Sequence, residues 1–466
     1  MYFKDLAYVI PELTMLGASL ALLIAGMAIG ERWVRGLAVL FVGSASGVAA
    51  AELAQFSGDA VSLFNGMIAR TGHVYLSRVI VLLTGLAAFL LFFFANRSYR
   101  YEFSVLMLLA TLGSVCIVQA DHFLSFYLSF ELIGFASYIL VCFNRSSRKA
   151  SEAAIKFFIL GAISSCLMLY GISFVYGYSS SFEFSVLAKV LAGEGSMGEA
   201  FGCALVLVGV LFKLAAVPFH MWLPDTYQGA STVAVMFFTI VTKTALILTV
   251  TRVTRALDTS LFTYQWVMVL LAISSMVVGE FGAMQQKNIK RLLAYANIGH
   301  IGFVIAALAG NNATFNALLY YTVTYVLINM WIFSIVLMYD DEGFEIPSMA
   351  GISAKYPIMS LMLVSSMLAS SGLPPFSGFF AKYAILKSVA SLSAGNLHIF
   401  VCIIFLSITS IIPCYYCFRI AKVVYFDEAR DDVPAIIGSV GLYVVALVSV
   451  VLSVIMVFYR DHFDAF

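Results

Sequence analysis

Charged side chains are scarce in this sequence. Only 11% of its 466 residues are Asp, Glu, Lys or Arg, whereas 62% are hydrophobic. A soluble domain carries roughly 25% charged residues, so this chain has too few of them to cover a surface that faces water. The shortage excludes a soluble globular protein and indicates that most of the surface faces lipid.

Strong net charge and the motifs of soluble enzymes are also missing. The formal net charge is +1, which gives no basis for binding nucleic acid. There is no Gly-x-Gly-x-x-Gly after a strand, no P-loop and no histidine pair at haem or zinc spacing. The 7 cysteines are scattered, and only Cys414 and Cys417 approach a C-x-x-C motif, so we expect packing residues and no metal. We therefore expect no cofactor in this chain, and any electron transfer must take place in another subunit.

What the sequence does contain is a series of long apolar segments. A helix that spans a bilayer needs about 20 apolar residues. Segments of this kind predict an all-α polytopic membrane protein with about fourteen spans and no soluble domain between them. The segments lie near 8–29, 33–55, 73–95, 101–119, 121–143, 151–177, 201–229, 231–252, 261–283, 289–309, 313–339, 354–391, 396–420 and 434–459.

Two of these segments are interrupted by proline. One contains Pro218 and Pro224, and the other contains Pro374 and Pro375. Proline lacks a backbone N–H and clashes with the preceding turn, so each helix should break there and its freed carbonyls need partners in protein or water. Two broken helices in the two halves of a chain, each near a lysine, are typical of a duplicated transporter with inverted repeats. We therefore regard Pro218 and Pro375 as secondary site candidates.

The loops differ in their positive charge. Loops after odd-numbered spans carry about 14 Lys and Arg residues, against about 8 in the other loops and at the two ends. We expect the loops after odd-numbered spans to face the cytoplasm or matrix, because positive loops stay on that side.

Four lysines fall inside predicted spans. A lysine at the centre of a bilayer costs about 2.5–3.5 kcal/mol. Lys156 lies one turn inside its span, so its side chain can lie buried or reach the interface. Lys213, Lys243 and Lys382 have apolar neighbours on both sides, as does Glu131. One carboxylate cannot neutralise three lysines, which favours proton transfer over a structural ion pair.

Buried lysine and glutamate suit proton transfer, because removal from water disfavours their charged forms and a neighbouring charge can then switch them. His300 lies about two turns into its span and is a candidate relay, while a hydrogen-bonded packing histidine fits the same pattern. His220, between Pro218 and Pro224, is expected to cap exposed carbonyls or to contact water. Glu280 lies near the end of its span and is expected at the membrane interface.

Four stretches of the sequence resemble the antiporter-like membrane subunits of respiratory complex I. They are 151–165 (SEAAIKFFILGAISS), 212–225 (FKLAAVPFHMWLPD), 288–295 (NIKRLLAY) and 372–382 (GLPPFSGFFAK). Together they are specific, and the resemblance extends over nearly the whole chain. Within the family the chain looks like the N type, because the M type usually has glutamate where Lys382 stands and the L type usually carries an extra C-terminal helix.

The resemblance implies a fold of fourteen helices with two inverted five-helix repeats, in which helices seven and twelve are broken. The chain departs from the family pattern at Gln228, where glutamate is frequent, and at Asn297, where serine is common. The resemblance implies one membrane domain over 1–466. Within it, 1–100 holds three N-terminal helices, 101–252 and 261–420 hold the two repeats, and 434–466 holds a final helix.

The resemblance also implies a set of functional residues. The family's proton-transfer residues on helices five, seven, eight and twelve correspond to Glu131, Lys213, Lys243 and Lys382. His300 corresponds to a histidine on helix ten.

For function, the resemblance implies an N-type subunit of a proton-pumping NADH:quinone oxidoreductase. NADH, flavin, iron–sulfur clusters and quinone are then expected in partner subunits, with K-type and M-type subunits as membrane neighbours. A subunit of a Mrp-type cation/proton antiporter is the alternative, and an inert anchor of the membrane arm is the third possibility. The start of the sequence lacks the features of a transit peptide, which favours the bacterial inner membrane over the mitochondrial inner membrane.

Overall fold

The computed structural model describes residues 6–56, 61–95, 97–184, 196–256, 262–309, 315–339, 345–391, 397–428 and 439–459. Among these residues, twelve helical stretches are long and apolar enough to cross a membrane, and Ile10–Ala25 and Pro357–Ser371 are shorter apolar helices. Together they match the number of spans that the sequence predicts, and they confirm an all-α polytopic membrane fold.

The chain folds into two compact units. Unit 1 consists of Met1–Lys213 and Phe237–Ser260, and unit 2 consists of Leu214–Met236 and Leu261–Phe466. The first division falls directly after Lys213, where the first proline-containing span is broken.

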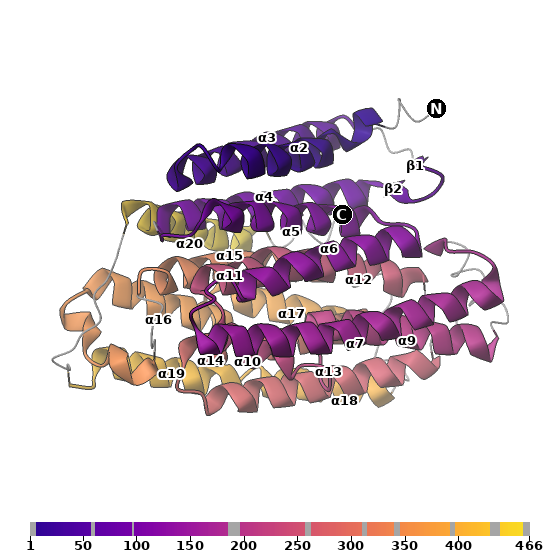
Figure 1. Cartoon of the computed structure of the whole chain (residues 1–466). Coiled ribbons are helices and arrows are strands. Elements are labelled where there is room, and N and C mark those ends of the chain that lie inside the picture. The colour runs from indigo at the N-terminus through magenta and orange to yellow at the C-terminus, as the bar shows by residue number, and fades with distance from the viewer. Residues whose placement is uncertain are drawn as a thin grey trace. The chain divides into compact units, whose positions relative to one another are not determined.

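Unit 1 contains the N-terminal helices and a small hairpin. Its described helices are η1 (Ala7–Val9), α2 (Ile10–Ala25), α3 (Glu31–Ala54), α4 (Gly72–Ala95), α5 (Tyr101–Gln119), α6 (Phe123–Val141), α7 (Arg148–Ser179), α9 (Met197–Leu214), η2 (Phe238–Thr242) and α12 (Lys243–Ala256). Strands β1 (Val61–Leu63) and β2 (Ile68–Arg70) pair antiparallel between α3 and α4. In Figure 1, α2 and α3 run side by side, and α4 lies next to α3.

Unit 2 holds the remaining elements. Its described helices are α10 (Trp222–Gly229), α11 (Thr232–Phe237), α13 (Phe262–Met284), α14 (Ile289–Leu308), α15 (Phe315–Val336), η4 (Ile346–Met349), η5 (Ile352–Ala354), α16 (Pro357–Ser371), α17 (Ser377–Ala390), α18 (Leu397–Thr409), α19 (Ile412–Tyr425) and α20 (Val440–Phe458). The pair α13 and α14 is in close contact over much of its length.

Local sequence signals explain where several helices begin. The side chains of Ser147, Asn288 and Ser439 each accept a backbone N–H bond at the starts of α7, α14 and α20. These residue types satisfy N–H groups that have no partner within the first turn. Prolines occupy the first turns of α2, α16 and α19, where the missing N–H costs nothing.

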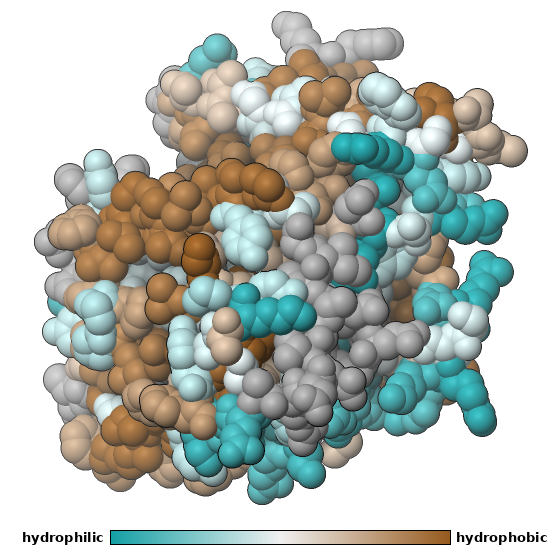
Figure 2. All heavy atoms as spheres, turned by 90° about the vertical axis from the view of Figure 1, so that its left-hand side faces the viewer, coloured by the Kyte–Doolittle hydropathy of each residue, from teal (hydrophilic) through white to brown (hydrophobic). Residues whose placement is uncertain are grey.

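The outer surface of the helices is apolar. Large hydrophobic side chains such as Leu128, Ile163 and Leu270 are more than half exposed. Figure 2 shows broad hydrophobic areas on one face of the molecule. Exposed apolar area of this extent is typical of contact with lipid.

The two proline-containing spans are both broken. In the first, α9 ends at Leu214 and is followed by Ala215 with φ +63° and by the cis Val217–Pro218 bond. In the second, α16 ends at Ser371 and is followed by Gly372 with φ +85° and by the cis Pro374–Pro375 bond. In both breaks, the residue directly after the first helical segment has a positive φ.

Candidate functional site

Lys213 lies one residue before the end of α9 and is buried. The residue is 6% exposed. Its Nζ lies 4.7 Å from the ring centroid of Phe130 and 5.3 Å from that of Tyr138, both on α6. Gly134 makes room for the amine, because a Cβ atom at that residue would lie 2.8 Å from Nζ. The aromatic faces attract a cation electrostatically, so α6 provides a partial substitute for water around the ammonium.

Glu131 belongs to the same face of α6 and is half-buried. Its Oε1 accepts a 2.6 Å hydrogen bond from the Ser165 hydroxyl of α7, and the oxygen of that hydroxyl lies 2.9 Å from the Tyr127 hydroxyl. The Glu131 carboxylate and the Lys213 ammonium also attract each other. The Ser165 hydroxyl of α7 is therefore the hydrogen-bond partner of this carboxylate.

A cavity of about 660 Å³ reaches this part of unit 1. Tyr138, whose ring lies beside Lys213, lines the cavity together with Arg100, Glu102 and Arg145. Arg100 and Arg145 belong to loops that follow the third and fifth predicted spans, so their charge predicts the cytoplasmic or matrix side. The cavity thus connects a charged loop region with the aromatic ring next to the buried lysine.

Lys243 is the first residue of α12 and is 3% exposed. It directly follows η2, which is a π-helical segment inside an otherwise α-helical span. Short π-helical segments of this kind occur frequently at functional sites. Because η2 and α12 pack against α4 and α5, the lysine lies deep within unit 1.

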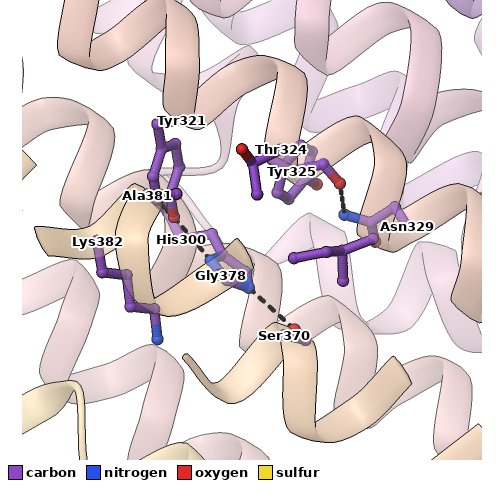
Figure 3. A pocket seen from close by; sticks show the side chains of 10 residues that line it. His300, Tyr321, Thr324, Tyr325, Asn329, Ser370, Gly378, Ala381 and Lys382 are labelled. Carbon is purple, nitrogen blue, oxygen red and sulfur yellow. Dashed lines mark hydrogen bonds between the residues drawn. The ribbon is translucent and has the colours of Figure 1, made fainter. Parts of the chain in front are cut away.

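His300 lies on α14 in unit 2, between two hydroxyl groups. Its Nδ1 is 2.7 Å from the Tyr321 hydroxyl, and its Nε2 is 3.3 Å from the Ser370 hydroxyl (Figure 3). These residues and Lys382 line a cavity of about 20 Å³, which is large enough for about one water molecule. His300 is therefore held by hydrogen bonds, as a packing histidine is, and it also borders a polar space.

Lys382 lies on α17 and is 6% exposed. Its Nζ donates a 2.8 Å hydrogen bond to the carbonyl of Ser371, the last residue of α16. The last carbonyls of a helix have no partner within the helix and carry partial negative charge, so a lysine stabilises them. Nζ also lies 5.1 Å from the ring centroid of Phe303 on α14.

The secondary candidates lie closer to the surface. The side chain of Lys156 is 45% exposed and forms a 2.8 Å ion pair with Glu152, so the lysine reaches the surface of α7. Pro218 and Pro375 are exposed at the two breaks. His220 is half-buried at the first break.

Glu280, which the sequence places near the end of its span, is covered by other helices. Glu280 is 1% exposed on α13. Its Oε2 accepts a 3.4 Å hydrogen bond from the Tyr416 hydroxyl of α19, and the carboxylate and Lys382 attract each other. Although Glu280 lies one turn before the end of α13, α14 and α19 cover that turn. The sequence feature that indicates the burial of Glu280 is its position between apolar residues on both sides.

A second group of buried charges in unit 1 was not expected from the sequence. Arg78 of α4 is 1% exposed, and its Nε and Nη2 donate to the Glu12 carboxylate at 2.8 and 2.5 Å. Its Nη1 donates to Glu52 at 2.5 Å. Gln119 donates a 2.6 Å hydrogen bond to Glu12 as well. Arg78 lies about one turn inside the predicted span 73–95.

Comparison with known families gives one match over most of the chain. The model of the family "NADH:quinone oxidoreductase/Mrp antiporter, TM" matches residues 120–407. This range includes all five principal candidate residues.

Known relatives and solved structures are similar to the chain over nearly its full length. The "NADH-quinone oxidoreductase subunit N" of Anaplasma phagocytophilum (strain HZ) is 60% identical over 99% of this chain and 100% of the relative. The protein of the same name from Anaplasma marginale (strain Florida) is 46% identical over 100% of this chain and 97% of the relative.

One similar structure is a chain of the respiratory complex I from Thermus thermophilus with bound aureothin. The TM-score is 0.82 at 28% identity, covering 97% of this chain and 98% of that one. A chain of the Mrp complex from Dietzia sp. DQ12-45-1b has a TM-score of 0.85 at 19% identity, covering 100% of this chain and 96% of that one. The second similarity concerns the fold alone.

Proposed function

The chain belongs to the family of N subunits of NADH-quinone oxidoreductase, and we propose that it conducts protons through the membrane along five residues. It is a multi-pass membrane subunit of this respiratory complex, as its relatives are. The proposed residues are Glu131, Lys213, Lys243, His300 and Lys382. Quinone reduction in other subunits supplies the energy.

The observation that carries this proposal is the burial of three lysines. Lys213, Lys243 and Lys382 are only 3–6% exposed within apolar helices. Three uncompensated lysines would cost on the order of 10 kcal/mol in a membrane. Leucine or methionine could pack at these positions without the energetic cost of burying a charge. A lysine at such a position is therefore a functional candidate by default.

The surroundings of Lys213 suit switching more than permanent neutralisation. Aromatic rings and an attraction from Glu131 stabilise the ammonium, while the Glu131 carboxylate is hydrogen-bonded to Ser165. A unit charge pair is worth ~4 kcal/mol at 4 Å and ~2 kcal/mol at 8 Å in a medium of effective dielectric constant near 20. A movement of Glu131 over several ångströms would therefore change its attraction for the Lys213 ammonium by ~2 kcal/mol.

We propose the following order of proton transfer. Movement of Glu131 relative to Lys213 acts as the gate, and the proton passes by Lys243 and His300 to Lys382 and the outer side. At each step an N–H bond breaks, the nitrogen keeps the electron pair, and the proton binds the next base or an intervening water. The cavity beside His300 offers space for one such water.

The wider assembly follows from the same proposal. K-type and M-type subunits would be the membrane neighbours, in a bacterial inner membrane. NADH, flavin, iron–sulfur clusters and quinone would bind to partner subunits. A Mrp-type cation/proton antiporter remains the alternative, but it rests on a shared fold at 19% identity, whereas relatives up to 60% identical are N subunits.

The test is a set of lysine-to-arginine variants in the assembled complex. Arginine keeps the positive charge but does not release its proton, so it separates charge from proton transfer. We expect Lys213→Arg and Lys243→Arg to lower the rate of proton pumping at least about tenfold in inverted membrane vesicles. Lys149→Arg, the same change at an exposed lysine, should leave pumping unchanged. Full pumping with normal quinone reduction in Lys213→Arg and Glu131→Ala would reject the pathway.

A further inference from the structure

We propose that the cavity beside the start of α5 binds the headgroup of phosphatidylethanolamine, with the lipid phosphate on two arginines and the lipid ammonium on Glu102. The cavity has a volume of about 660 Å³, and ligand pockets measure roughly 300–1,000 Å³. It lies within unit 1, where the first turn of α5, the end of α6 and the start of α7 contribute its lining. The inference concerns lipid binding, so its test does not depend on the proposed proton pathway.

Two arginines supply positive charge to the lining of the cavity. Arg100 directly precedes α5, and Arg145 lies in the loop between α6 and α7. Both residues are exposed, and neither guanidinium has an ion pair or hydrogen bond within the part of the chain that the structure describes. A guanidinium binds a phosphate through two parallel N–H bonds. Basic pockets between membrane helices on the side of the positive loops are typical sites for phospholipid headgroups.

The loop between α6 and α7 also offers an uncharged donor. Asn144 and Ser146 both line the cavity, and the Ser146 hydroxyl donates a 2.7 Å hydrogen bond to Oδ1 of Asn144. The side-chain NH₂ group of Asn144 carries two N–H donors that this bond does not use. The loop therefore presents a guanidinium and an amide to the oxygens of one phosphate.

Glu102 gives the cavity a charge of the opposite sign. It lies in the first turn of α5, where the partial positive charge of the helix end favours the ionised carboxylate. Its Oε2 is buried and accepts no hydrogen bond from any residue that the structure describes. A buried carboxylate oxygen needs a donor, and its charge needs a cation. Because neither arginine of the lining forms an ion pair with Glu102, a ligand that carries both a phosphate and a cation would satisfy all three side chains.

The chemistry of the headgroup selects ethanolamine among the common phospholipids. Its primary ammonium carries a positive charge and three N–H donors, as the lysine ammonium does. The hydroxyl groups of phosphatidylglycerol donate hydrogen bonds but do not neutralise a carboxylate. The quaternary ammonium of phosphatidylcholine has the charge but no N–H. Phosphatidylethanolamine therefore matches both requirements of Glu102.

Apolar side chains on α6 and α7 indicate a lipid and not a soluble phosphate compound. Ile139 of α6 and Ile155 and Phe158 of α7 line the cavity and are each about half exposed. The Phe158 ring meets the Tyr138 ring edge to face with centroids 5.6 Å apart, and Tyr138 lines the cavity as well. Acyl chains joined to a headgroup at the arginines would cover this apolar surface, which a soluble ligand would leave exposed.

The principal test uses the assembled complex without any substitution. A phosphatidylethanolamine with a diazirine in one acyl chain is activated by light, and labelled peptides are identified by mass spectrometry. We expect labelling of peptides that contain Ile139, Ile155 or Phe158. Unlabelled phosphatidylethanolamine should compete about tenfold better than phosphatidylglycerol, because a hydrogen bond between charged groups contributes about this factor to binding. Equal competition by the two lipids would overturn the proposed headgroup, and absence of label from these peptides would overturn the site.

Glu102→Gln tests the ammonium end of the site, since it keeps the shape of the side chain and removes the charge. We expect the preference for phosphatidylethanolamine over phosphatidylglycerol to shrink to less than about twofold while labelling persists. Glu152→Gln is the matched control, because Glu152 is an exposed acid of α7 outside the lining. It should retain the full preference. An unchanged preference in Glu102→Gln would overturn the assignment of the ammonium to this carboxylate.

The double variant Arg100→Gln with Arg145→Gln tests the phosphate end. We expect labelling of the α6 and α7 peptides to fall about tenfold, and Arg148→Gln, at an exposed arginine outside the lining, to have no effect. Normal labelling in the double variant would overturn the site. If the double variant does not assemble, the competition experiment on the unaltered complex decides, because it needs no substitution.

Discussion

The ammonium of Lys382 donates a 2.8 Å hydrogen bond to the backbone carbonyl of Ser371, across the break between α16 and α17. The lysine therefore caps the first half of a broken helix, and the same nitrogen is proposed to bind and release a proton. Release of that proton keeps an N–H donor on the amine, so the cap can persist while the charge changes.

Lys382→Arg separates these two roles. Arginine supplies a cation and donors for the Ser371 carbonyl, but it does not deprotonate. We expect the complex to assemble with nearly normal thermal stability and to pump protons at least about tenfold more slowly. Lys382→Met, which also loses the cap, should lower the thermal stability as well. Normal pumping in Lys382→Arg would show that the residue is only a cap.

Arg78→Leu should destabilise unit 1. It leaves the Glu12 carboxylate without its buried cation, whereas Glu52 keeps a 3.5 Å ion pair with Arg70. Breaking a buried pair in this way costs about 3–5 kcal/mol. We expect a clear drop in the thermal-denaturation midpoint or a loss of assembled complex. The control is Glu152→Ala, which removes an exposed ion pair with Lys156 and should cost less than about 1 kcal/mol. Equal effects of the two variants would contradict a structural role for the Arg78 cluster.

Gly279→Ala tests the close approach of α13 and α14. The new methyl group would meet the backbone of Gly299, which cannot move like a flexible side chain. We expect a lower denaturation midpoint and weaker pumping, because the helices must separate near Glu280. Gly47→Ala is the matched control in α3, where a Cβ atom would meet nothing within 4 Å. The control should be neutral or slightly stabilising, since alanine favours a helix by roughly 0.5–1 kcal/mol over glycine. A neutral Gly279→Ala would mean that the two helices are not held this closely.

His122 should contribute a pH dependence to stability. Its Nδ1 accepts the Leu124 N–H at the start of α6, and burial lowers the pKa of His122 below 6.5 despite the opposing charges of Glu183 and Asp121. A lowered pKa means that the unfolded chain binds the proton more tightly. The contribution is therefore complete above pH 6.5 and is lost as the pH falls from 6.5 through the folded pKa.

The corresponding variant is His122→Asn, which can still cap the helix but does not titrate. We expect the denaturation midpoint to fall less for the variant than for the parent protein between about pH 7.5 and about pH 5.5. An identical fall in the two proteins would exclude His122 as the source of this pH dependence.

Several features of the fold could be predicted from the sequence because they depend on local properties. The hydropathy of a span is the sum over its consecutive residues. The spans could therefore be predicted without knowing which helices pack against them. Proline acts on its own turn, so the breaks around Pro218 and Pro375 were visible as well. Lys213, Lys243 and Lys382 lie far from both ends of apolar segments, so their burial followed from position alone.

Charges near the end of a span could not be resolved in this way. Glu280 lies about one turn before the end of α13 and Lys156 about two turns after the start of α7. Lys156 nevertheless reaches the surface, whereas Glu280 is buried. The difference lies in which helices cover each turn: α14 and α19 pack over Glu280, whereas the side chain of Lys156 projects from an exposed part of α7. The sequence alone determined that this chain crosses the membrane many times, breaks two of its helices and carries lysines inside them. Only the tertiary structure decided which acid lies near which base, because residues far apart in sequence become neighbours only when helices pack.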